Sequence, residues 1–313
     1  MKKQILIIKT GATGDVVRTS VLLHVFENDE ITWVTAEKNK CVLPDRFPAL
    51  KQVIAIEDVL TCKHLEDKVF DWVLSLDDEM KSVQLVSSLF YKKLTGAFYN
   101  KEHQKIEYTD DSAAWFDLSL ISRYDKETAD KMKYEATKSV QAYLYEMVGR
   151  TFSGEEYLIP EEIIANPNPK LIGIEERAGA RWPTKRWNGY EKLAQELEEK
   201  GYEVRFFKER ANMRDFMRDI AECSLVITGD TLSMHFALAL KIPTVAIFTC
   251  TTPHEIYDYG RMEKVISPFL WEAFYKTEYI PEAVESITQE MVEKAIEKVV
   301  KNILYSRRIE LIS

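Results

Sequence analysis

The chain has 313 residues, more than one hydrophobic core of ordinary size needs, so we expect two domains. Its content of 46% hydrophobic and 30% charged residues is that of an ordinary globular protein. A net charge of −9 argues against a general nucleic-acid-binding protein, which needs a basic surface, although a local basic pocket remains compatible with it.

The sequence contains no recognisable targeting signal or metal-binding motif. There is no apolar stretch long enough for a transmembrane helix, and the first apolar run, 5–8, is too short for a signal peptide. The four cysteines (Cys41, Cys62, Cys223 and Cys250) lack a Cys-x-x-Cys spacing, so we expect reduced thiols and a cytoplasmic protein. The acidic pairs Asp77-Asp78 and Asp110-Asp111 are adjacent rather than spaced as Asp-x-Asp. We therefore expect neither a metal nor a cofactor.

Strands and helices alternate in the first half of the chain. Apolar runs predict strands at 4–9, 31–35, 53–56 and 72–76, and helical spacing predicts helices from Val16 onward and over 81–94. This alternation indicates an α/β domain with a parallel sheet between helices. Residues 100–126 have no sustained period and are either a substrate-contacting loop or a packed irregular connection. Residues 127–148 predict one long helix that ends at Gly149.

The segment 159–169 separates two domains, because its three prolines cannot belong to a helix or a central strand. The alternation then resumes, with strands at 170–174, 203–207, 224–227 and 243–248 and helices at 190–200 and 213–222. We therefore predict an N-terminal domain over 1–160 and a C-terminal domain over 170–287. Thr288 can cap a last helix with one apolar stripe.

The segment 228–235, Thr-Gly-Asp-Thr-Leu-Ser-Met-His, lies between a strand and an apolar helical segment. The free N–H groups and positive dipole end of a helix start form an anion site. An acid, two hydroxyls and a histidine share this turn, so the expected ligand combines phosphate with hydroxyl-rich groups, as a nucleotide sugar does. His235 itself is either a phosphate contact or an ordinary packed residue.

The turn 10–15 follows the first strand in the same way. Gly11 and Gly14 allow close approach to the backbone, but their spacing is neither the dinucleotide-binding fingerprint nor a P-loop. Asp15 is in the first helical turn. It either stabilises the helix dipole or serves as a general base at the mouth of a cleft.

Four cations lie within ten residues after the strand 170–174: Arg177, Arg181, Lys185 and Arg186. Their position past the carboxyl end of a strand suggests a diphosphate site, while a solvated loop with cation–aromatic packing explains them equally well. Glu209, after the strand 203–207, is placed similarly, although an exposed loop acid is the simpler interpretation.

Together these motifs resemble glycosyltransferase family 9, the heptosyltransferase family. Residues 9–15, Lys-Thr-Gly-Ala-Thr-Gly-Asp, look like its amino-terminal Gly-Asp turn, and 185–187, Lys-Arg-Trp, look like its Lys-x-Trp signature. Residues 229–235, followed by Ala237, Ala239, Pro243 and 246–248, are similar to its Asp-Thr-Gly-x-x-His donor motif.

The resemblance implies an α/β protein of the GT-B fold, two Rossmann-like domains facing each other across a cleft, with helix 288–313 crossing back to the first domain. It also implies metal-independent, inverting transfer of heptose from ADP-heptose to a lipopolysaccharide-type acceptor. The family's base corresponds to Asp15, in the acceptor-side turn with Thr10, Gly11, Thr13 and Gly14. The implied donor-binding residues are Lys185, Glu209, Asp230, Thr231, Ser233, His235 and Thr251.

The implied partners are a nucleotide sugar and a glycan or glycolipid acceptor, with peripheral contact at the inner membrane surface left open, and a monomer is expected. Two departures concern the donor motif: Leu232 replaces a usual glycine, and Thr249-Cys250 replaces a common Gly-Pro. Two other functions remain open. One is a sugar-nucleotide epimerase of similar fold, and the other is a non-catalytic protein that binds a nucleotide sugar.

Overall fold

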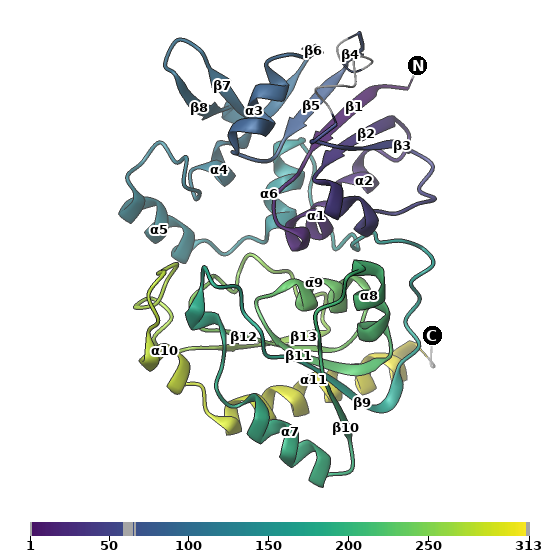
Figure 1. Ribbon diagram of the computed structural model, residues 1–313, viewed down its shortest axis with the longest axis vertical. Helices are drawn as coiled ribbons and strands as arrows, with labels where there is room; N and C mark the ends of the chain where they lie inside the picture. Colours follow the sequence, from purple (N-terminus) through teal and green to yellow (C-terminus); the bar gives the residue numbers. More distant parts are fainter. Residues whose placement is uncertain (1, 59–64, 66, 311–313) are drawn as a thin grey trace. The chain divides into compact units, whose positions relative to one another are not determined.

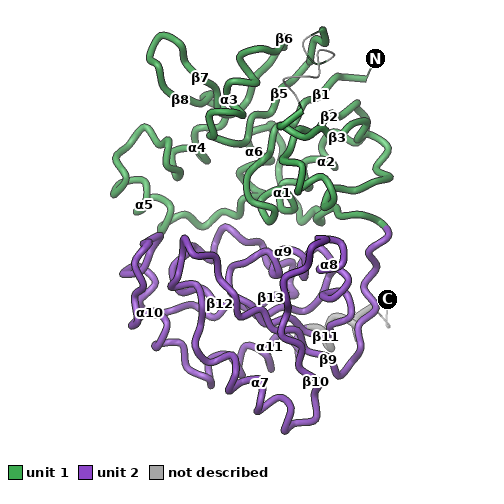
Figure 2. The backbone as a smooth tube through the Cα atoms, viewed as in Figure 1, with its two compact units in different colours: residues 1–161 green, residues 162–313 purple. Residues whose placement is uncertain are grey.

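The computed structural model of the protein describes residues 2–58, 65 and 67–310, so Cys62 lies outside the described residues. The chain divides into two compact units, Met1–Glu161 and Glu162–Ser313 (Figure 2). The division lies inside the proline-containing segment 159–169. The last two residues of that segment, Asn168 and Pro169, already belong to the first strand of unit 2, β9 (Asn168–Glu175), which pairs on both sides. The expectation that none of these prolines lies in a central strand is therefore wrong for Pro169, and the break in structure is confined to the residues before Asn168.

Unit 1 contains a six-stranded sheet in the order β3-β2-β1-β5-β7-β8 (Figure 1). All neighbours are parallel except β7 and β8, which form an antiparallel hairpin. A separate parallel pair joins β4 to β6. The strands are β1 (Gln4–Ile8), β2 (Glu30–Thr35), β3 (Leu50–Ala55), β4 (Val69–Phe70), β5 (Trp72–Ser75), β6 (Phe90–Tyr91), β7 (Leu94–Asn100) and β8 (Lys105–Tyr108).

The helices of unit 1 are shorter than the sequence suggests. The expected helix over 81–94 is wrong beyond Val86, because β6 pairs with β4 and Leu94 begins β7. The expected single helix over 127–148 is two helices: Ala136 is extended, and the Ser139 side chain accepts the N–H of Ala142 to start the second. The helices are α1 (Thr13–Thr19), α2 (Leu22–Val25), α3 (Met80–Val86), α4 (Ala113–Phe116), α5 (Lys126–Glu135) and α6 (Val140–Met147).

The segment 100–126 is in large part a packed connection. It contributes β8 and α4, and Phe116 of α4 is buried against Val83 and Ala97. The Tyr108 ring stacks on Phe116 with ring centroids 5.5 Å apart. These contacts are tertiary, so no local periodicity in the sequence reports them.

Unit 2 contains a five-stranded, all-parallel sheet in the order β10-β9-β11-β12-β13. Helices α8 and α9 cover one face, and α7 and α11 cover the other (Figure 1). The strands are β9 (Asn168–Glu175), β10 (Glu203–Phe206), β11 (Cys223–Gly229), β12 (Thr244–Phe248) and β13 (Met262–Ile266). The helices are α7 (Tyr190–Glu199), α8 (Met213–Ala221), α9 (Leu232–Ala239), α10 (Pro281–Glu285) and α11 (Gln289–Glu310), with the 3₁₀ turn η5 (Pro183–Lys185).

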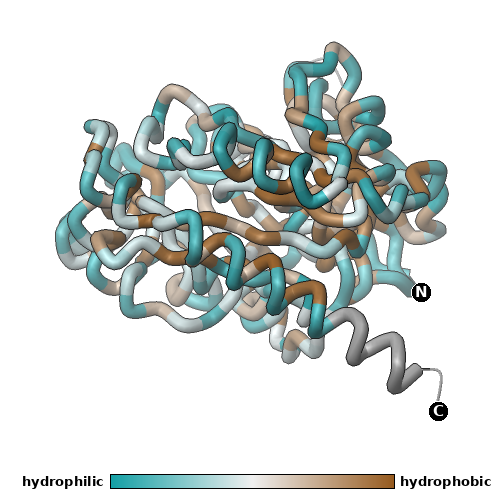
Figure 3. Tube along the Cα trace, turned by 90° about the horizontal axis from the view of Figure 1, so that it is seen from below, coloured by the Kyte–Doolittle hydropathy of each residue, from teal (hydrophilic) through white to brown (hydrophobic). Residues whose placement is uncertain are grey.

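The first part of α11 packs in the core of unit 2, and the expectation that helix 288–313 crosses back to the first domain stays a prediction. Thr288 accepts the N–H of Met291 at 3.3 Å, as its expected cap role requires. Val292, Ala295 and Val299 enter the same core as strand residues of β12 and β13. The helix has both hydrophobic and hydrophilic faces (Figure 3), and its apolar face covers a sheet surface that would otherwise be exposed.

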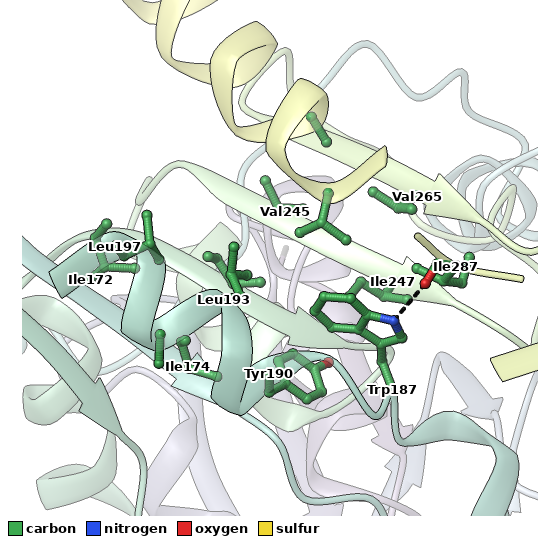
Figure 4. Close-up of a cluster of buried hydrophobic side chains, with 14 of the residues drawn as sticks. Ile172, Ile174, Trp187, Tyr190, Leu193, Leu197, Val245, Ile247, Val265 and Ile287 are labelled. Carbon is green, nitrogen blue, oxygen red and sulfur yellow. Dashed lines mark hydrogen bonds between the residues drawn. The ribbon is translucent and has the colours of Figure 1, made fainter. Parts of the chain in front are cut away.

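Trp187 anchors the loop after β9 in this core (Figure 4). The indole is 3% exposed, lies 5.2 Å from the Tyr190 ring, and donates from Nε1 to the carbonyl of Ile287 at 2.9 Å. Gly189 leaves room for the indole, because a Cβ there would lie 2.1 Å from its ring. The segment ending in Trp187 is therefore fixed at one end by a buried, hydrogen-bonded aromatic side chain.

The first turn of unit 1 is fastened by Asp77, which follows β5. Since β1 and β5 are parallel neighbours, their carboxyl ends meet at one edge of the sheet. The Asp77 carboxylate accepts hydrogen bonds from the Thr10 N–H, from the Thr10 hydroxyl at 2.8 Å and from the Gly11 N–H at 3.1 Å, and it pairs with Lys9. Burial favours a higher pKa for Asp77, but the charge of Lys9 and the hydrogen bonds outweigh it and hold the pKa below its ordinary value.

Replacing Asp77 by Asn keeps the side-chain shape and removes the charge that Lys9 requires. We expect a loss of about 3 kcal/mol in the free energy of unfolding near neutral pH, since a buried charge is left without its partner. Asp71→Asn is the matched control. Asp71 also pairs with a lysine and accepts a backbone N–H, but its carboxylate is more exposed than that of Asp77, so the loss of stability should be smaller. Urea unfolding followed by fluorescence measures both.

The pH dependence gives a second measurement on the same variants. Because the folded pKa of Asp77 is below its ordinary value of 3.8, its stabilisation is present above that pH and is lost as the pH falls through the folded pKa. The stability gap between wild type and Asp77→Asn should stay constant near neutrality and shrink below about pH 4. A gap that persists unchanged in acid would contradict the role of the charge.

Candidate functional site

The carboxyl edge of the unit 2 sheet gathers most of the donor-binding residues expected from the sequence. Residues following β9, β11 and β12 meet there, because Thr228 of β11 is in register with Glu175 and Gly229 with Ile247. This edge is where open α/β sheets bind ligands.

The central contact is an ion pair between Lys185 and Asp230. The Lys185 Nζ lies 2.9 Å from Asp230 Oδ2 and 3.0 Å from the Asp230 carbonyl oxygen. Both side chains are more than four-fifths buried, at 17% and 19% exposure. An ammonium has three N–H donors, and two of them point to Asp230. Across residues 2–58, 65 and 67–310, no acceptor is recorded for the third, which leaves it for a ligand.

Asp230 is strongly held in its ionised form. Burial favours a higher pKa, but the charge and hydrogen bond of Lys185, with smaller contributions from His235 and Thr251, lower the pKa of Asp230 well below its ordinary value. The Thr251 hydroxyl is buried near this carboxylate without a hydrogen bond of regular geometry. Asp230, His235 and Thr251 therefore form one electrostatic group with Lys185.

Helix α9 begins at this group. Thr231 is its N-cap, and the Thr231 hydroxyl lies 2.9 Å from that of Thr228 instead of capping an N–H. The first N–H groups of a helix generally lack an acceptor within the helix and can bind an anion, although in α9 the Met234 N–H already donates to the Thr231 carbonyl at 3.1 Å. Leu232 is the first helical residue and has no positive φ, so the backbone at this turn does not require the glycine of the family pattern.

Ser233 has a hydrogen-bond partner within the chain, and its expected donor-binding role stays a prediction. It is buried, and its hydroxyl donates to Glu175 Oε2 at 3.0 Å. Glu175 also forms a bidentate pair with Arg177, at 2.8 and 2.7 Å. Sequence reasoning missed Glu175 as part of this site. Its position as the last residue of β9, next to β11, was the signal that could have identified it.

The four cations after β9 have separate roles. Arg177 pairs with Glu175, Arg186 pairs with Glu176 at 2.5 Å, and Arg181 lies 5.0 Å from the Trp182 ring centroid. Lys185 alone among them reaches Asp230. Cation–aromatic packing therefore describes Arg181, and the diphosphate role stays a prediction for Lys185.

Glu209 is exposed on the loop after β10, and its charge acts on Arg177. None of the contacts within the described chain brings it to Lys185 or Asp230.

The expected residues of unit 1 gather at the carboxyl edge of its own sheet. Asp15 lies in the first turn of α1, 32% exposed, and pairs with Arg18 at 2.9 Å. The Thr13 hydroxyl donates to Asn39 Oδ1 at 2.7 Å, and Asn39 donates to the Thr10 carbonyl at 3.0 Å. Gly14 is buried within α1.

The turn of unit 1 is not an open anion site, because Asp77 occupies the N–H groups of Thr10 and Gly11. Sequence reasoning considered Asp77 only as half of an acidic pair. Its position directly after the predicted strand 72–76 was the available signal. Two of the backbone donors of the turn are therefore already used within the chain, and the role of Asp15 stays a prediction.

Within the described ranges, no helix combines the length and apolarity needed to cross a membrane. The same residues contain no cluster of three or more His, Cys, Asp or Glu side chains suited to a metal ion.

Comparison with known proteins gives a family match. The model of glycosyltransferase family 9 (heptosyltransferase) matches residues 61–215 and 209–278, more than half of the chain. The matched residues include the whole Lys185–Asp230 group and leave out the turn with Asp15. No curated protein matches the sequence.

Solved structures of similar fold cover nearly the whole chain. A family 9 glycosyltransferase from Veillonella parvula has a TM-score of 0.67 at 18% identity, over 95% of this chain and 97% of that one. The E. coli heptosyltransferase WaaC with ADP-2-deoxy-2-fluoro heptose has 0.63 at 16%, over 94% and 99%. E. coli ADP-heptose LPS heptosyltransferase II has 0.61 at 17%, over 98% and 100%.

These similarities agree with the two Rossmann-like units and with the motifs at their carboxyl edges. The chain belongs to glycosyltransferase family 9, the heptosyltransferase family, and is a glycosyltransferase of the GT-B fold.

Proposed function

We propose that this glycosyltransferase moves heptose from ADP-heptose to a hydroxyl of a lipopolysaccharide-type glycolipid or another surface glycan, with inversion and without a metal. The donor is suggested by the similar E. coli proteins, one solved with an ADP-heptose analogue and one described as an ADP-heptose LPS heptosyltransferase. Family membership favours transfer over the epimerase and non-catalytic alternatives.

The observation that supports the proposal most directly is the Lys185–Asp230 pair beside the start of α9. The third N–H of Lys185 and the first N–H groups of α9 can donate hydrogen bonds to the oxygens of a diphosphate. Fixed donors in a partly buried site stabilise the negative charge that develops as ADP leaves. In this role they replace the charge compensation that a divalent cation supplies elsewhere.

Asp15 is the proposed general base. The acceptor hydroxyl gives its proton to the carboxylate, its oxygen bonds to the anomeric carbon, and the bond from that carbon to the diphosphate breaks. The position of Asp15 in the first turn of α1, where the helix dipole favours an acid, and its accessible carboxylate suit this task.

Replacing Asp15 by Ala should lower the turnover number by at least about 100-fold while ADP affinity stays nearly intact, because the base acts on the acceptor and not on the donor. Transfer kinetics and calorimetry with ADP measure the two effects. Asp130→Ala is the control, since Asp130 is another helical acid of unit 1 in an ion pair within its own helix. Near-wild-type turnover of Asp15→Ala would refute the base assignment.

Replacing Lys185 by Ala should weaken ADP binding about tenfold or more, because a charged hydrogen-bond donor to the diphosphate is lost. Calorimetry with ADP measures the change. Arg186→Ala is the matched control, since the adjacent cation pairs with Glu176 and should leave the affinity unaltered. Equal affinities of Lys185→Ala and wild type would count against the diphosphate role.

Chelation tests the metal independence. Initial rates of transfer measured in excess EDTA should equal those in Mg²⁺, because Lys185 and the α9 N–H groups supply the charge compensation. A rate that collapses in EDTA and returns with added Mg²⁺ or Mn²⁺ would show that a metal is required.

Incubation with the donor alone distinguishes a transferase from a sugar-nucleotide epimerase. A transferase should leave ADP-heptose unisomerised when no acceptor is present. Accumulation of an isomerised sugar nucleotide, followed by NMR, would instead indicate an epimerase.

A further inference from the structure

Thr249 makes a buried hydrogen bond that links the end of β12 to the loop bearing Lys185. The residue directly follows β12 and is 1% exposed. Its hydroxyl donates to the main-chain carbonyl of Thr184 at 2.5 Å. The two residues are 65 positions apart in the sequence, so only the folded unit brings them together.

Thr184 transmits this restraint to its neighbour Lys185. It is fully buried in the 3₁₀ turn η5, and its own hydroxyl donates to the Glu278 carbonyl at 3.2 Å and accepts the Ile280 N–H at 3.0 Å. Side chain and main chain of Thr184 are thus held from two directions. The residue that follows it cannot shift without breaking one of these bonds.

The main chain of Lys185 also approaches the end of β11 closely. A Cβ on Gly229 would lie 3.1 Å from the Lys185 carbonyl oxygen. Gly229 thus allows the Lys185 main chain to lie close to the end of β11. At the end of the neighbouring strand, β12, the Thr249 hydroxyl forms a hydrogen bond to the residue before Lys185. Together they fix the lysine backbone against the ends of β11 and β12, which are parallel neighbours.

This placement matters because a lysine side chain is long and flexible. Four rotatable bonds separate its backbone from the ammonium, and side-chain rotamer entropy of about 2 kcal/mol opposes any single orientation. Lys185 nevertheless donates both to Asp230 Oδ2 and to the Asp230 main-chain carbonyl oxygen. A fixed main chain at Lys185 reduces the number of positions that the ammonium can occupy.

We propose that Thr249 is a positioning residue for donor binding: its hydroxyl fixes residues 183–185 and thereby aims the Lys185 ammonium at the donor diphosphate. Thr249 does not itself contact the ligand. The identity of the ligand rests on the proposed function, whereas the restraint on Lys185 does not.

Three variants isolate the hydroxyl. Thr249→Val keeps the volume and removes the donor, leaving the Thr184 carbonyl buried without it, and Thr249→Ser keeps the donor. Thr244→Val is the matched control: Thr244 is a buried threonine at the other end of β12, and its hydroxyl also bonds a main-chain carbonyl, that of Ile242 at 2.9 Å.

The first measurement needs no ligand. Each purified protein is treated with an amine-acylating reagent, and the rate at which Lys185 is modified is followed by peptide mass spectrometry. We expect a several-fold faster modification of Lys185 in Thr249→Val, because the ion pair with Asp230 opens more often. Thr249→Ser and Thr244→Val should match the wild type.

The second measurement is the affinity for ADP by calorimetry. Thr249→Val should bind ADP about tenfold more weakly, as expected when a charged donor is misplaced, and Thr249→Ser should recover most of the loss. In the Lys185→Ala background, Thr249→Val should have no further effect, because the group through which it acts is gone.

These measurements distinguish a positioning role of Thr249 from a general loss of stability in the variants, and from an error in the proposed donor. An unchanged acylation rate of Lys185 in Thr249→Val overturns the proposal. So does a loss of ADP affinity that persists in full in the Lys185→Ala background, or one that Thr244→Val reproduces. Faster acylation in Thr249→Val, with no ADP binding by any protein including the wild type, supports the restraint and overturns the proposed donor instead.

Discussion

The ion pair between Lys185 and Asp230 is the interaction on which the proposed donor site depends. A carboxylate as buried as Asp230 is costly unless a cation is held beside it, and the cation must come from a loop 45 residues earlier in the chain. Trp187 anchors that loop in the core, Gly229 allows its close approach, and Thr249 bonds to its main chain. Three separate contacts in unit 2 therefore hold the Lys185 ammonium beside the turn that contains Asp230.

Both units contain a lysine–aspartate ion pair at the carboxyl edge of the sheet, but the two pairs have different consequences. In each, a lysine at the carboxyl edge of the sheet pairs with an aspartate that follows another strand: Lys9 with Asp77, and Lys185 with Asp230. Asp77 also accepts the N–H groups of Thr10 and Gly11, so these two donors of the unit 1 turn already bind an anion that the chain itself supplies. Asp230 leaves the first N–H groups of α9 to a ligand. This difference is compatible with the proposed phosphate role of unit 2 and the proposed acid–base role of unit 1.

The two departures from the family pattern are compatible with this site. Leu232 opens α9 without positive φ, so a side chain is accepted where the family usually has glycine. Thr249 stands where a glycine is common, and a glycine could not donate the hydroxyl hydrogen bond to Thr184. One departure is therefore tolerated by the backbone, and the other adds a contact that supports Lys185.

The sequence by itself determined the α/β class, most strands, the break near 159–169, and the residues at the ends of β1 and β11, because alternation, prolines and glycine turns are local signals. The apolar spacing over 127–148 hid the break between α5 and α6, although its cause, the Ser139 cap, is local. The sequence could not reveal the place of α11 in unit 2 or the contacts of Asp77, Glu175 and Thr249. Those depend on which strands become neighbours and in which register. Since parallel strands align carboxyl ends from distant parts of a chain, only the tertiary structure decides which side chains meet there.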